Sequence, residues 1–363
     1  MRFVAGALVA LLAACDATSS THDAAVTPAV AASSPGGAAL EAGLAKIRAH
    51  DEGGAIDDLT RAIELDPRCV DAYRWRGHCF NLLGSYAEAI EDYDHAIELD
   101  PSYAWSHYAR GMANHNLGRH ELAIAGYTRS IELDPGFLKA WNWRGFTRKL
   151  VGDYAGAAQD LRHALDVAPD DPWALFELAK CEQALGDLDA CRSALERARA
   201  VNPADASLAA QRGFLEAVRG DQAAALAFLA TACEAHAPEE TYARIWTWIL
   251  TADRGAADAA LRAWFDSARI DDTWELRLAA FLLGEGTDQL LALRAEEETR
   301  RRASEGRPRD FLVCEAAFYA GVRHEFAGAT AAAQAAYVRA RAEAASEAWE
   351  WHLAAVRARA LGG

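Results

Sequence analysis

The stretch Ile-Glu-Leu-Asp-Pro occurs three times in the sequence, at 63–67, 97–101 and 131–135, so each copy begins 34 residues after the one before it. The proline of the motif keeps this interval over a longer part of the chain, at Pro67, Pro101, Pro135, Pro169 and Pro203. A fixed period of this length is typical of a repeat architecture, in which each unit packs mainly on its neighbours.

Two other residue classes follow the same period. A glycine recurs at Gly84, Gly118, Gly152, Gly186 and Gly220, and a small residue recurs at Ala55, Ala89, Ala123, Ala157, Cys191 and Ala225. Glycine can adopt the left-handed conformation that ends a helix, and proline cannot continue one. Each unit is therefore predicted to hold two closely packed helices, with a turn at the glycine and a stop before the proline.

This pattern resembles the tetratricopeptide repeat (TPR) family, in which each unit is a helical hairpin. Six units fit the sequence, at 36–69, 70–103, 104–137, 138–171, 172–205 and 206–239, and the first carries His50 in place of the turn glycine. The resemblance implies an all-α fold, a right-handed α-α superhelix in which stacked hairpins form a solenoid with a concave surface.

The period weakens after residue 239. Residues 240–310 are predicted to form degenerate helical pairs and a highly charged loop. Gly321, Gly328 and Tyr337 restore the internal spacing of a repeat, so residues 311–363 are predicted to form a last TPR-like unit and a capping helix.

The N-terminus has the layout of an export signal. Residues 1–14 run from a basic residue through an apolar stretch to small residues, and Leu12-Ala13-Ala14-Cys15 resembles the lipobox of bacterial lipoproteins. In that family the cysteine is acylated and becomes the new N-terminus, which implies a palmitate-type anchor on Cys15 and a flexible tether over 15–35. An ordinary signal peptide with a coincidental cysteine is the alternative.

The lipobox resemblance implies a bacterial cell-envelope protein that is lipid-anchored and faces the periplasm. Asp16 directly follows the cysteine. In enteric bacteria such an aspartate favours retention in the inner membrane, and an outer-membrane location stays open.

The composition excludes several functional classes. The 37 basic and 53 acidic residues give a net charge of −16, whereas a nucleic-acid binder needs a basic footprint. Hydrophobic residues make up 52% of the chain, which argues against wholesale disorder. No apolar run reaches the roughly 20 residues of a spanning helix, which argues against a polytopic membrane protein.

The order of parts carries a more specific resemblance. A lipobox, about six repeats, Ile-Trp-Thr-Trp at 245–248 and Phe-Tyr-Ala-Gly at 318–321 together resemble the "new lipoprotein I" family of bacterial TPR lipoproteins. Members of that family are periplasm-facing adaptors that bring cell-wall hydrolases and a processing protease together, often as homodimers. The resemblance implies partners of the same kind for this chain.

Motifs of catalysis and metal binding are missing. No GxxxxGK[ST] loop, GxSxG elbow or SxxK pair occurs, and the HExxH-like strings that begin at His120 and His324 lack their second histidine. His107, His115 and His120 are close in sequence, but the repeat frame assigns them to different helix faces. We therefore expect no catalytic residues, no metal site and no cofactor. An enzyme with its site in 240–310 stays open as a less favoured alternative.

Six cysteines remain besides Cys15, and an exported compartment permits disulfides. Cys181 and Cys191 are predicted on facing helices of one unit, where a disulfide between them is one hypothesis. The alternative is that Cys191 serves only as a small apolar filler.

In the TPR family, positions 2, 5, 9 and 12 of the first helix line the concave surface and contact peptides. These positions carry Arg74, His78, Asn81, Tyr108, Met112, His115, Lys139, Asn142, Phe146, Lys149, Phe176, Lys180, Gln183 and Phe214. Three of the four lysines of the chain are among them, which predicts a basic, aromatic-lined groove for acidic or amphipathic protein segments. A merely polar solenoid face is the alternative.

The sequence thus predicts a non-catalytic, membrane-anchored TPR scaffold that binds protein partners. An envelope polysaccharide assembly factor is the alternative from another class, since some TPR lipoproteins have that role.

Overall fold

The structure is a computed structural model that describes residues 35–235, 240–251, 254–267, 312–342 and 348–361, together with scattered positions between 278 and 299. The predicted signal peptide, the lipidated Cys15 and the tether up to residue 34 lie outside the described residues, as does most of the charged stretch 294–310. The described residues form helices and no strand, which confirms the predicted all-α fold.

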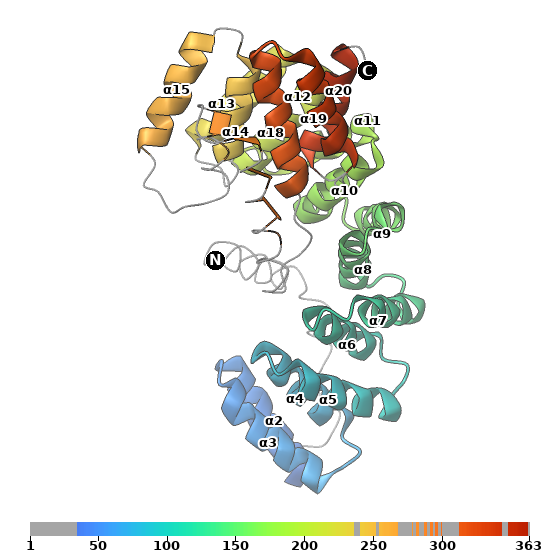
Figure 1. Cartoon of the computed structure of the whole chain (residues 1–363). Helices are drawn as coiled ribbons and strands as arrows, with labels where there is room; N and C mark the ends of the chain where they lie inside the picture. The colour runs from blue at the N-terminus through green and yellow to red at the C-terminus, as the bar shows by residue number, and fades with distance from the viewer. Residues whose placement is uncertain are drawn as a thin grey trace. The chain divides into compact units, whose positions relative to one another are not determined.

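The helices follow one another in pairs along the chain (Figure 1). The first helices of the pairs are α2 (Pro35–Arg48), α4 (Val70–Leu82), α6 (Ala104–Asn116), α8 (Leu138–Leu150), α10 (Pro172–Leu185), α12 (Ala206–Arg219), α14 (Glu240–Leu250) and α18 (Leu312–Phe326). Their partners are α3 (Glu52–Leu65), α5 (Tyr86–Leu99), α7 (His120–Leu133), α9 (Tyr154–Val167), α11 (Leu188–Val201), α13 (Gln222–Glu234), α15 (Arg254–Ser267) and α19 (Thr330–Ala342), and α20 (Trp349–Ala360) follows the last pair.

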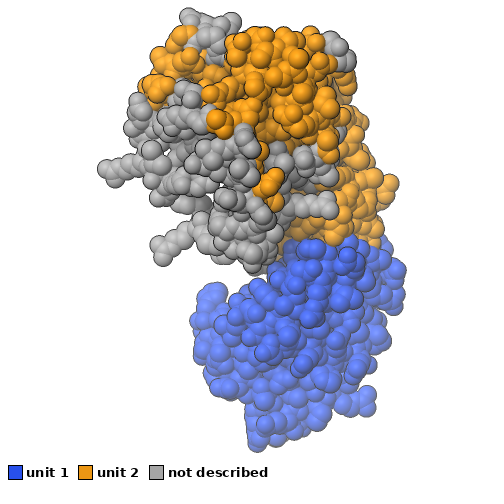
Figure 2. All heavy atoms as spheres, in the orientation of Figure 1, with its two compact units in different colours: residues 1–135 blue, residues 136–363 orange. Residues whose placement is uncertain are grey.

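The chain divides into two compact units, residues 1–135 and residues 136–363 (Figure 2). Helices α2–α7 belong to unit 1, and the helices from α8 onward belong to unit 2. Within the described ranges, no helix combines the length and the apolar character needed to cross a bilayer.

Close helix pairing in unit 1 depends on glycines that face large rings. A Cβ atom added to Gly77 of α4 would lie 2.9 Å from Cε1 of Tyr93 in α5, and one added to Gly111 of α6 would lie 2.8 Å from Cε1 of Tyr127 in α7. Both tyrosine rings are buried. The missing side chain of each glycine therefore makes the space that the tyrosine of the partner helix fills.

The turns inside the pairs have the predicted left-handed residue. Gly84 and Gly118 have φ angles of 80° and 72°, and in the first pair His50 takes this place with a φ of 58°. A residue with a Cβ atom is strained in this conformation by roughly 1–2 kcal/mol.

Three second helices of unit 2, α9, α11 and α13, begin at aspartates. Asp153, Asp187 and Asp221 each accept a hydrogen bond from the backbone N–H three residues later. Such a cap satisfies a donor that the first helical turn leaves without an acceptor.

The C-terminal helices pack back onto the repeats, since α20 contacts α12, α18 and α19. Trp246 of α14 is fully buried, with its ring centroid 4.9 Å from that of Phe214 and 6.5 Å from that of Phe318. Its Nε1 atom and the hydroxyl of Tyr319 donate hydrogen bonds to Oε1 of Glu350, at 3.2 and 2.9 Å. One carboxylate in α20 thus joins α14 and α18.

Arginines at a shared position of the first helix connect neighbouring helices. Arg76 donates to both carboxylate oxygens of Asp92 at 2.9 and 2.7 Å and to the hydroxyl of Thr60 at 3.1 Å, which ties α4 to both α5 and α3. Arg144 of α8 forms the same two-bond pair with Asp160 of α9, at 2.9 and 2.8 Å.

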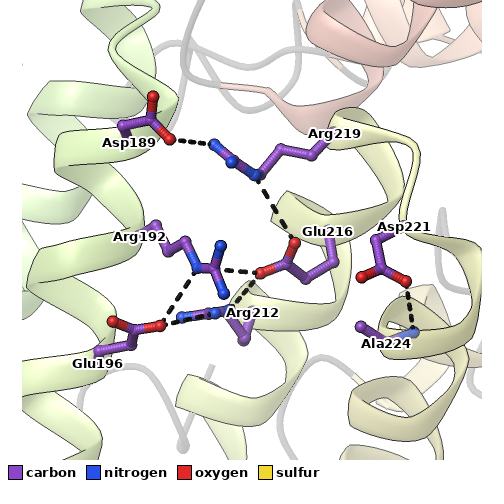
Figure 3. Close-up of polar contacts among 8 residues, drawn as sticks. All are labelled: Asp189, Arg192, Glu196, Arg212, Glu216, Arg219, Asp221 and Ala224. Carbon is purple, nitrogen blue, oxygen red and sulfur yellow. Dashed lines mark hydrogen bonds and ion pairs between the residues drawn. The ribbon is translucent and has the colours of Figure 1, made fainter.

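Between α11 and α12 the connection becomes a network of three arginines and three carboxylates (Figure 3). The buried Arg212 donates to Glu216 at 2.6 Å and to Glu196 at 2.9 Å. Arg192 lies between the same two carboxylates, and Arg219 reaches back to Asp189 (Figure 3). Both helices are therefore held by charge pairs that leave few groups unpaired.

Candidate functional site

All fourteen residues predicted to line a groove lie on first helices of the pairs. Those of unit 1 are on α4 and α6, and those of unit 2 are on α8, α10 and α12. We call the side of these helices that carries them the first-helix face and describe it separately for each unit.

In unit 1 the arginine of the face, Arg74, is already paired with an acidic side chain. Arg74 is buried, its Nη1 atom lies 2.8 Å from Oδ1 of Asp71, and its guanidinium lies 3.7 Å from the ring centroid of Tyr103. Asn81 is half-buried, and its Oδ1 atom is buried without a hydrogen-bond donor. Arg74 therefore offers little charge to an acidic ligand.

Two tryptophans that were not among the predicted groove residues lie beside His78. The ring centroids of Trp75 and Trp105 are 6.5 Å apart, and the His78 ring lies 5.7 Å from the first and 6.2 Å from the second. All three rings are half-buried. We name this set Trp cluster 1.

The remaining predicted residues of unit 1 lie on α6. Tyr108 is buried against the ring of Tyr127, whereas Met112 is half-buried. His115 lies 5.6 Å from His120, ring centroid to ring centroid, although the repeat frame assigned the two histidines to different helix faces. Burial, with a smaller effect from His120, lowers the pKa of His115 to about 4. His115 is therefore neutral at physiological pH and adds no positive charge.

In unit 2 a buried glutamate lowers the positive charge that was expected of the groove. The Nζ atom of Lys149 lies 2.5 Å from Oε2 of Glu177, and Nζ of Lys180 lies 3.8 Å from Oε1 of the same carboxylate. Lys149 is only 7% exposed. Burial alone would raise the pKa of Glu177, but Lys180 and Lys149 outweigh it and hold that pKa below its ordinary value. The carboxylate is thus ionised and offsets one of the two lysines.

Sequence reasoning missed Glu177 because it considered only four positions of the first helix. Glu177 precedes Lys180 by one helical turn, so the i,i+3 spacing was the available signal for their pairing.

Each lysine also lies over an aromatic ring. Nζ of Lys149 is 4.9 Å from the centroid of Phe146, and Nζ of Lys180 is 4.4 Å from that of Phe176.

A second aromatic set on α8 and α10 matches the first. The ring centroids of Trp143 and Trp173 are 6.4 Å apart, and Phe146 lies 5.8 Å from each. We name these three residues Trp cluster 2. Next to it Asn142 is buried, donates from Nδ2 to Asp171 at 3.0 Å, and has an Oδ1 atom without a donor.

Three predicted residues remain in unit 2. Lys139 is half-buried and Gln183 is buried. Phe214 is only 4% exposed because the ring of Trp246 covers it, so it belongs to the core rather than to a binding surface. Its assignment to the groove is wrong, because α14 comes from a region where the repeat period had already weakened.

The hypothesis of a Cys181–Cys191 disulfide is not met in the structure. Both residues are buried on facing helices α10 and α11, and no disulfide joins them. Burial raises the pKa of the Cys191 thiol to about 12, so it packs as an unreactive small residue. In the part of the chain that the structure describes, no three His, Cys, Asp or Glu side chains are placed to hold a metal ion.

Comparison with family models assigns the repeats. Models of the TPR repeat match residues 77–118 and 106–137, and a further tetratricopeptide repeat model matches residues 151–212. The matched residues are tetratricopeptide repeats. The matched ranges contain His78, Trp105 and Trp173 of the two aromatic sets. Trp75 precedes the first matched range, and Trp143 and Phe146 fall between two of them.

One solved structure shows the same fold, and two others are reported for their similarity. The C-terminal part of a TPR repeat-containing protein from Cytophaga hutchinsonii has a TM-score of 0.57 and 16% identity over 64% of this chain and 96% of that one. Pseudomonas aeruginosa PilF has a TM-score of 0.48 and 18% identity, covering 55% of this chain and 91% of its own. YrrB, described as a TPR protein with an unusual peptide-binding site, has a TM-score of 0.45 and 21% identity, with coverage of 49% and 91%. No curated protein matches the sequence significantly.

Proposed function

We propose that this TPR chain is a non-catalytic scaffold that binds segments of partner proteins on its first-helix face. TPR repeats generally act as protein-interaction scaffolds. The observation that supports the role of this face is its set of half-buried aromatic and apolar side chains, among them Met112, Phe146 and Phe176. Such side chains supply contact area at low entropic cost, which is typical of binding hot spots.

The partner segments are amphipathic or acidic in this proposal. Lys180 of the α8–α10 face has 36% of its side chain exposed, and it can contact an acidic side chain at the rim. Since Lys149 and Arg74 are already paired with Glu177 and Asp71, apolar contacts contribute more to affinity than net positive charge. Binding therefore weakens only modestly with added salt.

The location is the bacterial cell envelope in this proposal, with the mature chain anchored through an acylated Cys15 and facing the periplasm. The resemblance of the sequence to the new lipoprotein I family supports cell-wall hydrolases or a protease as partners, and homodimer formation, in this proposal. The anchor is testable by fractionation. The wild-type chain, expressed in a bacterium, should sediment with membranes, and the Cys15→Ser variant should be released into the soluble fraction.

The binding role is tested by affinity capture from the native envelope with the full chain. Met112→Ala and Phe176→Ala remove half-buried side chains from the face of unit 1 and of unit 2, and Leu122→Ala is the matched control at a 58% exposed site on the second helix α7. Loss of one good hot-spot contact weakens binding about tenfold or more.

We expect Met112→Ala or Phe176→Ala to reduce the amount of captured protein by that factor, with the Leu122→Ala variant unchanged. Undiminished capture by both face variants, each with a wild-type circular dichroism spectrum, would rule out the first-helix face as the binding site. Hydrolysis of peptidoglycan or peptides by the purified chain alone would contradict the non-catalytic assignment.

A further inference from the structure

The two Trp clusters belong to a duplicated block of the chain. The sequence Ala-Tyr-Arg-Trp-Arg-Gly at 72–77 returns as Ala-Trp-Asn-Trp-Arg-Gly at 140–145, which is two 34-residue periods later. The same interval separates Trp75 from Trp143 and Trp105 from Trp173. The first helices of the second and fourth repeats thus share one tryptophan position, and those of the third and fifth repeats share another.

The geometry of the two copies agrees closely. The rings of Trp75 and Trp105 are inclined by 37° and those of Trp143 and Trp173 by 36°. The third ring meets the first tryptophan edge-on in both cases, with an interplanar angle of 84° for His78 and 85° for Phe146. Unit 1 and unit 2 therefore each contain one copy of the same three-ring arrangement.

Stacking of the repeats does not require these tryptophans. The two positions that hold Trp143 and Trp173 hold Glu177 and Ser207 one repeat later, on α10 and α12. Arg212 of α12 still pairs with Glu196 of α11 there, as Arg144 pairs with Asp160 beside Trp cluster 2. A large ring at these positions therefore occurs only at the two Trp clusters among the regular repeats and is not needed for the repeat fold.

Buried polar atoms without a hydrogen-bond partner lie beside both clusters. The Nε1 atom of Trp75 is buried without an acceptor, and Oδ1 of Asn81, one turn after His78 on α4, has no donor. In unit 2, Oδ1 of the buried Asn142 has no donor, and this residue lies one turn before Phe146 on α8. A buried polar group without a partner is costly, so such groups mark places where a ligand supplies the missing partner.

The buried cations beside the clusters are already matched. Arg74 is paired with Asp71 in unit 1, and Lys149 is paired with Glu177 in unit 2. A ligand that is neutral at the ring contacts therefore fits both clusters better than a charged one. An extended peptide backbone offers N–H groups to the asparagine oxygens and C=O groups to the indole N–H. In a proline-containing extended segment the backbone groups are free of internal hydrogen bonds, and the pyrrolidine rings pack on aromatic side chains.

We propose that each Trp cluster binds one uncharged, proline-containing extended segment, so that a single chain holds two copies of the same motif. The clusters lie on the proposed protein-binding face, so this inference rests on the proposed function and names the part of the partner segment that contacts the rings. A partner that carries the motif twice, or a dimeric partner, gains avidity from the second site without any new type of contact.

The test is calorimetric titration of the full chain with a synthetic peptide of alternating alanine and proline. We expect two peptides per chain. Trp75→Leu and Trp143→Leu each keep an apolar side chain and should each leave one peptide per chain, and the double variant should bind about thirtyfold or more weakly. Trp141→Phe is the matched control, because Trp141 packs on His163 outside the cluster, and it should still bind two.

If a leucine variant fails to fold, His78→Ala and Phe146→Ala remove the third ring of each cluster and take its place. The inference is overturned if the wild-type chain binds one peptide and both single cluster variants still bind one. It is also overturned if the wild-type chain binds no peptide at millimolar concentration. It is also overturned if a peptide of alternating alanine and glutamate, or a chitin-type oligosaccharide, occupies the clusters in preference. In each of these cases capture that depends on Met112 or Phe176 would leave the proposed scaffold function standing.

Discussion

The Nζ atom of Lys149 in α8 lies 2.5 Å from Oε2 of Glu177 in α10, and both side chains are buried. This pair joins two consecutive repeats of unit 2 at the first-helix face. It also decides the charge of that face, because the same carboxylate faces Lys180 at 3.8 Å.

Removing the carboxylate should destabilise unit 2. Glu177→Ala leaves the buried Lys149 without its anion, and breaking a buried pair in this way costs about 3–5 kcal/mol. Urea unfolding of the full chain, followed by circular dichroism, measures the loss. Glu132→Ala is the control, since Glu132 and its partner Arg129 are both about half exposed and such pairs contribute less than about 1 kcal/mol. Equal effects of the two substitutions would contradict the structural role of Glu177.

The same pair predicts a pH dependence. The pKa of Glu177 is lowered in the folded state, so its contribution to stability is fully present above the ordinary glutamate value of about 4.3. The contribution is lost as the pH falls through the lowered value. Acid unfolding of the wild-type chain should therefore show a loss of free energy that the Glu177→Ala variant lacks.

Close packing of α4 on α5 predicts the effect of a single methyl group. Gly77→Ala would place Cβ 2.9 Å from the ring of the buried Tyr93, and such overpacking costs about 1–3 kcal/mol. Gly53→Ala in α3 meets no atom within 4 Å and should leave stability unchanged or raise it by up to about 1 kcal/mol. Thermal melts of both variants check the opposite signs.

These glycines illustrate what the sequence was able to predict. The 34-residue period placed Gly77 and Gly84 in phase with their counterparts, and each class of glycine has one physical role, close approach or a left-handed turn. The confirmed all-α solenoid fold depends on such local rules, which repeat in every unit. His50 was also recognised from the period alone as the residue that replaces a turn glycine.

The binding face was harder to predict, because its character depends on contacts between repeats. Glu177 neutralises a lysine that lies 28 residues away, and Trp75 meets a tryptophan of the next repeat. Trp246 covers Phe214 from outside the regular repeats. None of these contacts follows from the residue composition of one helix face, so the sequence overstated the positive charge of the face.

The strained turn of the first repeat offers a stabilising change. His50 has a φ of 58° and its side chain is exposed, so His50→Gly removes strain without removing packing. The gain should be about 0.5–1 kcal/mol, since the greater freedom of glycine in the unfolded chain offsets part of the relieved strain. A rise in the melting temperature of the full chain is the expected result, and a fall would show that His50 makes a stabilising contact.

Glu350 predicts a second pH dependence with the opposite sign. Burial raises the pKa of this carboxyl, which accepts hydrogen bonds from Trp246 and Tyr319. Its contribution to the packing of α20 is fully present below the ordinary glutamate value and is lost as the pH rises through the raised value.

Hydrogen exchange of α20, corrected for the intrinsic rate, should therefore become faster as the pH rises through the raised pKa of Glu350. Glu350→Gln keeps an acceptor oxygen but cannot ionise, so it should remove most of this increase. An unchanged increase in that variant would assign the pH dependence to other groups.

The most direct measurement of the central claim is site-specific photo-crosslinking in the native envelope. A photoreactive phenylalanine analogue replaces Met112 or Phe176 on the first-helix face. It replaces Leu122 or Val167 at second-helix positions that are 58% and 54% exposed. We predict adducts with partner protein from the two first-helix positions and none from the other two. Adducts that form only from Leu122 and Val167, or equally from all four positions, would contradict binding at the first-helix face.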